Sequence, residues 1–162
     1  MNLARFLKED SITLDVSEGI EVPEELGRKS LADLKERILD RIVHLLDGSG
    51  KVVNRSKLLQ DLVLREKKAS TALGDGIAIP HVRTLQAREF RMAVALAPGG
   101  LPFEAPDDRP VRIFIAMIAP PHDDRTYLSV YQRIARALVE EKAGEAILAA
   151  SSPGEIIRIL SA

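Results

Sequence analysis

A short apolar run limits most strongly what this chain can fold into. The run occupies residues 113–118 and reads Ile-Phe-Ile-Ala-Met-Ile. Neighbouring side chains of a β-strand point to opposite faces, so a strand of this composition is apolar on both. Such a strand is stable in the middle of a sheet that helices cover on both sides. The run therefore predicts a central strand.

Two further segments are predicted strands, Ile12 to Val16 and Arg91 to Leu96. Ile12 to Val16 alternates apolar and polar residues, which is typical of a half-exposed strand. Between the strand ending at Leu96 and the central strand at residues 113–118, Pro98-Gly99-Gly100 predicts a turn and residues 102–110 predict a loop. Residues 17–29 have no usable period, which predicts an irregular surface segment.

Four helices are predicted. The first begins at Ser30 as its N-cap and ends before Gly48-Ser49-Gly50, and the second begins at the N-cap Asn54 and runs through about Arg65. The third begins at Asp123 or Asp124, and Ser152-Pro153-Gly154-Glu155 forms a capping box that opens a short last helix. The expected buried faces are Leu31, Leu34, Ile38, Ile42 and Leu45; then Leu58, Leu59, Leu62 and Val63; then Leu128, Tyr131, Ile134, Ala135 and Leu138.

Strands and helices alternate along the chain, which predicts the α/β class with helices on both sides of a central sheet. The length of 162 residues suits one domain with a full core. We expect a single domain over residues 1–162, with the strand and irregular segment of residues 1–29 packed on it.

The composition excludes several classes of function. The chain has no cysteine, so disulfides, thiolate catalysis and cysteine-based zinc sites are excluded. Its net charge of -1, without a basic face, argues against a nucleic-acid partner. No apolar run is long enough to cross a bilayer and the amino terminus lacks a signal-peptide core, so we expect a cytoplasmic protein without a membrane partner.

The chain has three histidines, and their spacing is not that of metal ligands, so we expect no metal site. No nucleotide-binding or serine-hydrolase motif is present. The segment from Ser70 to His81 is the remaining candidate, because its glycines permit tight turns and Pro80 restricts the backbone before His81. A histidine held there suits a phosphoryl acceptor, with Ser70, Thr71 and Arg65 as donors to phosphate. The pattern alone leaves open that His81 is an ordinary residue at a strand end.

A longer sequence pattern that includes His81 favours the phosphoryl-acceptor role over that of an ordinary strand-end residue. The segment Arg65-Glu66-x-x-x-Ser70-Thr71-x-x-Gly74-x-Gly76-Ile77-Ala78-Ile79-Pro80-His81 resembles the signature of enzyme IIA of the phosphoenolpyruvate-dependent phosphotransferase system, of the fructose/mannitol and nitrogen-regulatory type. Residues 101–120 are similar to that family's central region. The resemblance runs from about Leu31 to Leu160 and implies a mixed sheet flanked by helices.

The resemblance assigns roles to individual residues. His81 matches the phosphorylated histidine, usually modified on Nε2, and Arg65 matches the arginine beside it. Ser70 and Thr71 match the hydroxyl pair of the active-site loop. Tyr127 stands where many relatives carry a second histidine, and a phenol donates a hydrogen bond but does not become cationic. His122, five residues earlier, is the alternative replacement for that histidine.

The implied function is that of a phosphocarrier. A phosphorylated HPr-like protein is the expected donor, and a IIB-type protein or a regulated target is the expected acceptor. No cofactor is needed, because the donor is itself a phosphohistidine. The absence of a IIB-like or membrane domain in this chain favours a regulatory, nitrogen-type role over sugar uptake. Two alternatives stay open, a sugar-specific IIA component and a binding module that works without phosphorylation.

Overall fold

The computed structural model describes residues 2–48 and 50–161, so Ser49 of the predicted glycine turn lies outside the described residues. The strands are β1 (Ile12–Thr13), β2 (Ala72–Gly74), β3 (Ile77–Ala78), β4 (His81–Arg83), β5 (Arg91–Leu101) and β6 (Val111–Ala119). They form one sheet in the order β1-β5-β6-β3-β2, and β4 also pairs with β6. The sheet is mixed, because β5 and β6 are antiparallel whereas β1, β3 and β4 each have a parallel partner.

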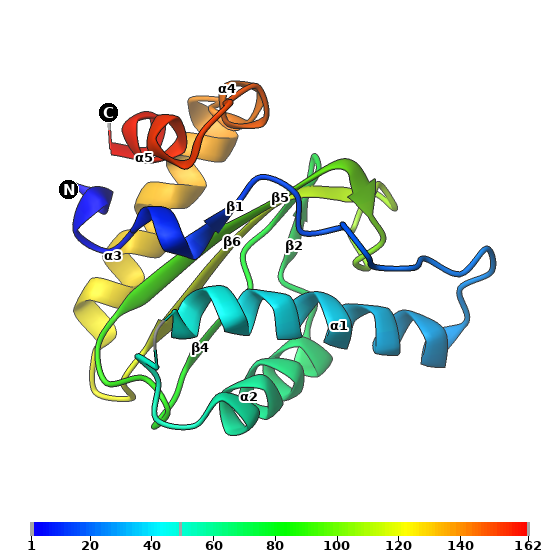
Figure 1. Ribbon diagram of the computed structural model, residues 1–162, viewed down its shortest axis with the longest axis horizontal. Helices are drawn as coiled ribbons and strands as arrows, with labels where there is room; N and C mark the ends of the chain where they lie inside the picture. The colour runs from blue at the N-terminus through cyan, green and yellow to red at the C-terminus, as the bar shows by residue number, and fades with distance from the viewer. Residues whose placement is uncertain (1, 49, 162) are drawn as a thin grey trace.

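Helices cover both faces of this sheet (Figure 1). On one face lie α1 (Arg28–Asp47) and α2 (Arg55–Lys68), and on the other lie α3 (Asp124–Ala135), α4 (Gly144–Leu148) and α5 (Pro153–Ser161). Residues 136–140 continue α3 as one π-helical turn. Two short 3-10 helices, Leu3–Arg5 and Glu9–Ser11, precede β1, and Leu3 and Leu7 are buried in the same core as α5.

The predicted central strand is β6, which has paired strands on both sides. Its alternate side chains enter two separate cores. Phe114 and Ile118 lie in the core under α1 and α2, whereas Ile115 and Met117 lie in the core under α3 and α5. The apolar character of both faces therefore reflects two helical layers, and the predicted arrangement of helices on both sides of a mixed sheet is confirmed.

β3 and β4 lie along the same edge of β6 in one continuous register. Ile77 is paired with Ile113 and His81 with Met117. Pro80, between the two strands, has no N–H to donate, but its carbonyl accepts a 3.0 Å hydrogen bond from the Met117 amide. Pairing with β6 thus extends along the chain up to His81.

The turn before β3 needs residues with left-handed backbone angles. Gly74, Asp75 and Gly76 have φ angles of 93°, 55° and 78°. Glycine adopts these angles without steric cost, and aspartate tolerates them better than most residues do. The carboxylate of Asp107 accepts a 2.9 Å hydrogen bond from the Asp75 amide, so Asp107 stabilises the turn.

The structure confirms two predicted helix caps. Asn54 Oδ1 accepts from the Lys57 amide at 3.0 Å, and Asp123 Oδ1 accepts from the Thr126 amide at 3.1 Å. Ser30 is not the N-cap of α1. That position belongs to Gly27, and Ser30 Oγ accepts a 2.8 Å hydrogen bond from the Gly27 amide. The helix starts earlier than predicted because Ser30, the third residue of α1, caps it by accepting this hydrogen bond from the residue before the helix.

Two other predictions are wrong. Pro98-Gly99-Gly100 lies inside β5, where the register with β6 shifts, because the long pairing with β6 accommodates the extra residues as an irregularity. Leu128 is 57% exposed, and Val130 is buried instead. The predicted helical face was therefore rotated. On the same helix, the side chain of Arg133 is only 18% exposed and pairs with Glu141.

Candidate functional site

His81 is held by the backbone of its own segment. Its Nδ1 lies 2.5 Å from the carbonyl oxygen of Ile79. A carbonyl only accepts hydrogen bonds, so Nδ1 carries the hydrogen and the neutral ring has its lone pair on Nε2. The half-buried imidazole is therefore oriented with Nε2 as its basic, nucleophilic atom.

Arg65, near the end of α2, lies beside this atom. Its Nη2 is 3.5 Å from His81 Nε2, and its Nη1 donates a 2.9 Å hydrogen bond to the carbonyl oxygen of Ala69. The backbone contact fixes the guanidinium next to the nitrogen. A planar guanidinium with several N–H donors suits the oxygens of a phosphoryl group attached there.

The surroundings of His81 favour its neutral form. Burial of the ring lowers the pKa of His81 below the usual 6.5, and the positive charge of Arg65 acts in the same direction. The hydrogen bond to Ile79 and the negative charge of Glu66 oppose this shift, but the burial effect is larger. The nucleophilic form of the ring therefore predominates at neutral pH.

We expect the His81 ring to protonate only as the pH falls below 6.5, its usual value. Because a cation beside the ring disfavours its charged form, Arg65→Met is expected to raise the pKa of His81. An NMR titration of the imidazole resonances measures both values. A wild-type pKa at or above 6.5, or an unchanged value in Arg65→Met, would contradict this account of the site.

The predicted hydroxyl donors have partners within the protein. Ser70 Oγ donates to the carbonyl oxygen of Phe103 at 3.3 Å, and Thr71 Oγ1 donates to Glu66 Oε2 at 2.6 Å. Thr71 is also buried. These hydrogen bonds hold the loop before β2 in place. A direct contact of either hydroxyl with phosphate stays a prediction, since it requires the hydrogen to leave its present acceptor.

Glu66 belongs to the signature, but the sequence assigned it no role. Its carboxylate accepts from both the amide and the hydroxyl of Thr71, at 2.9 Å and 2.6 Å. A signal for it was available, because Leu58, Leu62 and Glu66 follow one another at four-residue spacing on the buried side of α2. A carboxylate at a buried position requires partners, and Glu66 has them.

Two tyrosines of α3 contact the His81 ring. The ring of Tyr127 lies 5.8 Å from it between centroids, and that of Tyr131 lies 5.3 Å away in an edge contact. Burial raises the pKa of Tyr127 to about 12, so its phenol remains a hydrogen-bond donor. Tyr127 thus lies near His81, as its predicted role requires. Tyr131, which the sequence predicted only as a buried residue of the helix, lies there too. The two tyrosines are four positions apart, so both lie on one face of the helix.

His122 is exposed in the turn before α3. Among the residues described, the ring contacts of His81 are with the two tyrosines and do not include His122. The geometry therefore favours Tyr127 over His122 as the residue that stands in for a second histidine. His44 is exposed on α1, and its Nδ1 lies 2.8 Å from the Asp40 carbonyl oxygen.

The surface around the site combines apolar and cationic side chains. Leu64 precedes Arg65 and is 58% exposed, and Leu85 follows β4 and is 78% exposed. Both line a shallow hollow of about 440 Å³ together with Arg65 and Arg83. Leu73 of β2 is exposed, whereas Ile77 of β3 and Phe103 are buried.

Two kinds of feature were not found within residues 2–48 and 50–161. No three His, Asp or Glu side chains converge to hold a metal ion. No helix there is both long and apolar enough to span a bilayer.

Comparison with protein families identifies the chain. Residues 24–162 match the family model described as "Phosphoenolpyruvate-dependent sugar phosphotransferase system, EIIA 2". The chain belongs to this family. The resemblance seen in the sequence is thereby confirmed, and this IIA chain is a phosphocarrier component of the phosphotransferase system.

Relatives of this IIA chain include both sugar-specific and regulatory proteins. A fructose-specific EIIABC component of Bacillus subtilis is 30% identical over 127 residues, which cover 78% of this chain and 20% of that protein. The chain thus spans about a fifth of its length. A nitrogen regulatory protein of Pseudomonas aeruginosa is 31% identical over 104 residues, or 64% of this chain and 68% of that protein.

Solved structures share the fold. The nitrogen regulatory protein IIA-Ntr of Neisseria meningitidis superposes with a TM-score of 0.79 at 26% identity, covering 98% of each chain. A complex of IIA mannitol with phosphorylated IIB mannitol from Escherichia coli matches with a TM-score of 0.69 at 21% identity, covering 95% of this chain and 96% of that one.

Proposed function

We propose that this IIA chain carries its phosphoryl group on Nε2 of His81. The observation that supports this most directly is the pair of contacts around one ring. The Ile79 carbonyl occupies Nδ1 at 2.5 Å, and Nη2 of Arg65 lies 3.5 Å from Nε2. One nitrogen is thus used for orientation and the other is available for reaction beside a cation.

The transfer follows from this arrangement. The Nε2 lone pair attacks the phosphorus of a phosphohistidine on the donor protein, the new N–P bond forms, and the N–P bond of the donor breaks. The donor ring keeps the electron pair of that bond. Because the bond made is of the same kind as the bond broken, positioning and charge stabilisation suffice. Arg65 faces the negative charge of the phosphoryl oxygens.

Tyr127 is proposed as a second donor to the phosphoryl group. Its phenol stays protonated at neutral pH and its ring lies next to that of His81. Arg83 positions it, since the guanidinium lies 5.6 Å from the Tyr127 ring centroid and forms an ion pair with Asp124.

We expect Tyr127→Phe to slow phosphoryl transfer to His81 about fivefold, because one hydrogen bond contributes about 1 kcal/mol. Rapid-quench measurement of single-turnover transfer from phosphorylated HPr gives the rate. The thermal unfolding curve of the variant serves as a control for folding. A transfer rate equal to that of the wild type would remove Tyr127 from the proposed site.

The partners are proposed to be a phosphorylated HPr-like donor and a IIB-type acceptor or a regulated target protein. The exposed Leu64 and Leu85 beside the site provide apolar area for docking, and the nearby arginines give the surface a positive edge. Two proteins reach the same histidine in turn, which requires an open site of this kind. We place the exchange in the cytoplasm.

A regulatory role is proposed in preference to sugar uptake. The similarity to IIA-Ntr of Neisseria meningitidis, with a TM-score of 0.79 at 26% identity, supports this choice. Phosphorylation adds about -1.5 to -2 charges to the docking surface, which is enough to change the partner that binds. A sugar-specific IIA role remains the alternative that the fructose-specific relative favours.

Incubation with phosphoenolpyruvate, enzyme I and HPr tests the proposal. We expect intact-mass measurement to detect one added phosphoryl group that is lost in acid and retained in alkali, as a phosphohistidine is. Omission of HPr should prevent the addition. A chain that acquires no phosphoryl group with active HPr present would instead be a binding module that works without phosphorylation.

A further inference from the structure

We propose that Lys35 of α1 is a positioning residue for His81, acting through the Ser70–Thr71 loop from a pocket between α1 and α2. The inference rests on the proposed function of His81. It assigns a role in phosphoryl transfer to a residue 46 positions away in the sequence, outside the motif that contains the histidine.

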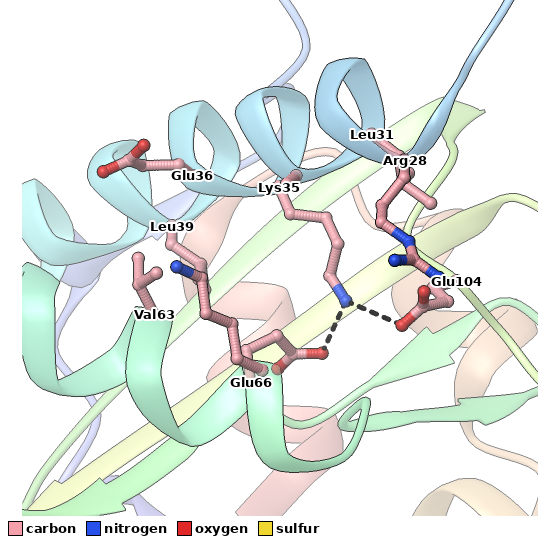
Figure 2. A pocket seen from close by; sticks show the side chains of 10 residues that line it. Arg28, Leu31, Lys35, Glu36, Leu39, Val63, Glu66 and Glu104 are labelled. Carbon is pink, nitrogen blue, oxygen red and sulfur yellow. Dashed lines mark hydrogen bonds and ion pairs between the residues drawn. The ribbon is translucent and has the colours of Figure 1, made fainter.

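The first connection runs through a nearly buried ion pair. The Nζ atom of Lys35 lies 3.2 Å from Glu66 Oε1, and the two side chains are 11% and 5% exposed. Both oxygens of Glu66 accept hydrogen bonds from Thr71, from its amide and its hydroxyl. Lys35 thus neutralises the carboxylate that anchors Thr71. Figure 2 shows its side chain extending down from α1 to that carboxylate.

Two backbone contacts complete the connection to the imidazole. The Ile79 amide donates to the Thr71 carbonyl oxygen at 3.0 Å. The carbonyl of the same Ile79 accepts from Nδ1 of His81. The position of Thr71 therefore sets the position of Ile79, which in turn sets the orientation of the ring.

A second connection from Lys35 reaches the neighbouring residue of the loop. The ammonium lies 4.9 Å from the centroid of the Phe103 ring. The carbonyl of Phe103 accepts from Ser70 Oγ at 3.3 Å. One lysine therefore contacts the partner of Ser70 and the partner of Thr71, so it is connected to both of these loop residues.

The surroundings argue for this role over simple packing. The pocket of about 500 Å³ around Lys35 also has apolar walls that include Leu31, Leu39 and Val63. An apolar side chain would suit such walls, and replacing a buried ion pair by apolar residues is often neutral or stabilising. Lys35 instead gives the Glu66 carboxylate a cation that an apolar side chain would not provide.

The test uses two substitutions with opposite electrostatic effects on His81. The charged and titratable groups that face the ring are Arg65 and Glu66 from α2, and Tyr127 and Tyr131 from α3. Lys35→Met leaves the negative charge of Glu66 without its cation, so the pKa of His81 is expected to rise. Glu66→Gln removes that negative charge, so the pKa of His81 is expected to fall. A packing defect alone has no reason to shift the two variants in opposite directions.

The rates of transfer provide the second measurement. We expect single-turnover transfer from phosphorylated HPr to slow about tenfold in Lys35→Met and in Glu66→Gln, because small misplacements of a reacting group are costly. Lys35→Arg restores a cation and should recover most of the rate. Glu104→Gln is the matched control. It removes the exposed partner of Lys35, whose side chain is 62% exposed, and should leave both pKa and rate unchanged.

Several outcomes would overturn the proposal. These are a His81 pKa that does not move in Lys35→Met, a shift of the same sign in both variants, or a Lys35→Met rate equal to wild type. If Glu66→Gln does not fold, the Lys35→Met and Lys35→Arg pair decides alone. The NMR titration needs no phosphorylation. A wild type that takes up no phosphoryl group would refute the proposed function, whereas opposite pKa shifts in that case would still show that Lys35 and Glu66 are coupled to His81.

Discussion

His81→Ala is expected to take up no acid-labile phosphoryl group when incubated with phosphoenolpyruvate, enzyme I and HPr. The Nε2 atom of His81 is the proposed nucleophile, and within the part of the chain that the structure describes its contacts with Ile79 and Arg65 are not reproduced at the other histidines. Intact-mass measurement over time compares the variant with the wild type. This prediction has the largest effect, because the reacting atom itself is removed.

His44→Ala provides the matched control for the loss of a histidine. His44 is exposed on α1 and is hydrogen-bonded within its own helix. We expect this variant to be labelled as fast and as fully as the wild type. Equal labelling of His81→Ala would refute the assignment of the site, although the chain would remain a member of the enzyme IIA family.

Leu58→Ala is expected to lower the free energy of unfolding by about 2–5 kcal/mol, because it leaves a cavity in a close-packed core. Leu58 lies on α2 with none of its surface exposed, in the core shared with α1 and one face of the sheet. The melting temperature should fall by about 2–4 °C for each kcal/mol lost. Urea unfolding at constant pH measures the change.

The same substitution at Leu64 controls for composition and helix propensity. Leu64 is on the same helix but is 58% exposed, so Leu64→Ala removes little buried area. We expect a change within about 0.5 kcal/mol, as for other surface substitutions. Similar losses in the two variants would mean that α2 does not pack through the side that contains Leu58.

Much of the fold could be predicted from local patterns. The apolar run of β6 predicted a central strand between two helical layers, because a strand apolar on both faces has no other stable position. Asn54 and Asp123 were recognised as caps, since a capping side chain acts on amides only a few residues away.

Predictions failed where distant contacts overrode local signals. Pro98-Gly99-Gly100 has the composition of a turn, but pairing with β6 keeps it within β5. Leu128 fits an apolar helical face, but the sheet contacts the face that contains Val130 and Ile134. In both places the deciding partner lies far away in the sequence.

The candidate site divides in the same way. The order Arg65, Ser70, Thr71 and His81 is a local pattern. Pro80 and the strand before His81 act only on the adjacent backbone. The sequence by itself therefore determined which histidine and which loop to consider. Only the tertiary structure decided the state of that histidine. Its neutral form, its available Nε2 and its ring neighbours depend on burial and on side chains from α2 and α3. The same is true of Lys35 and Glu66, because α1 and α2 bring their charges together only in the folded chain, where low solvent exposure makes the pairing matter.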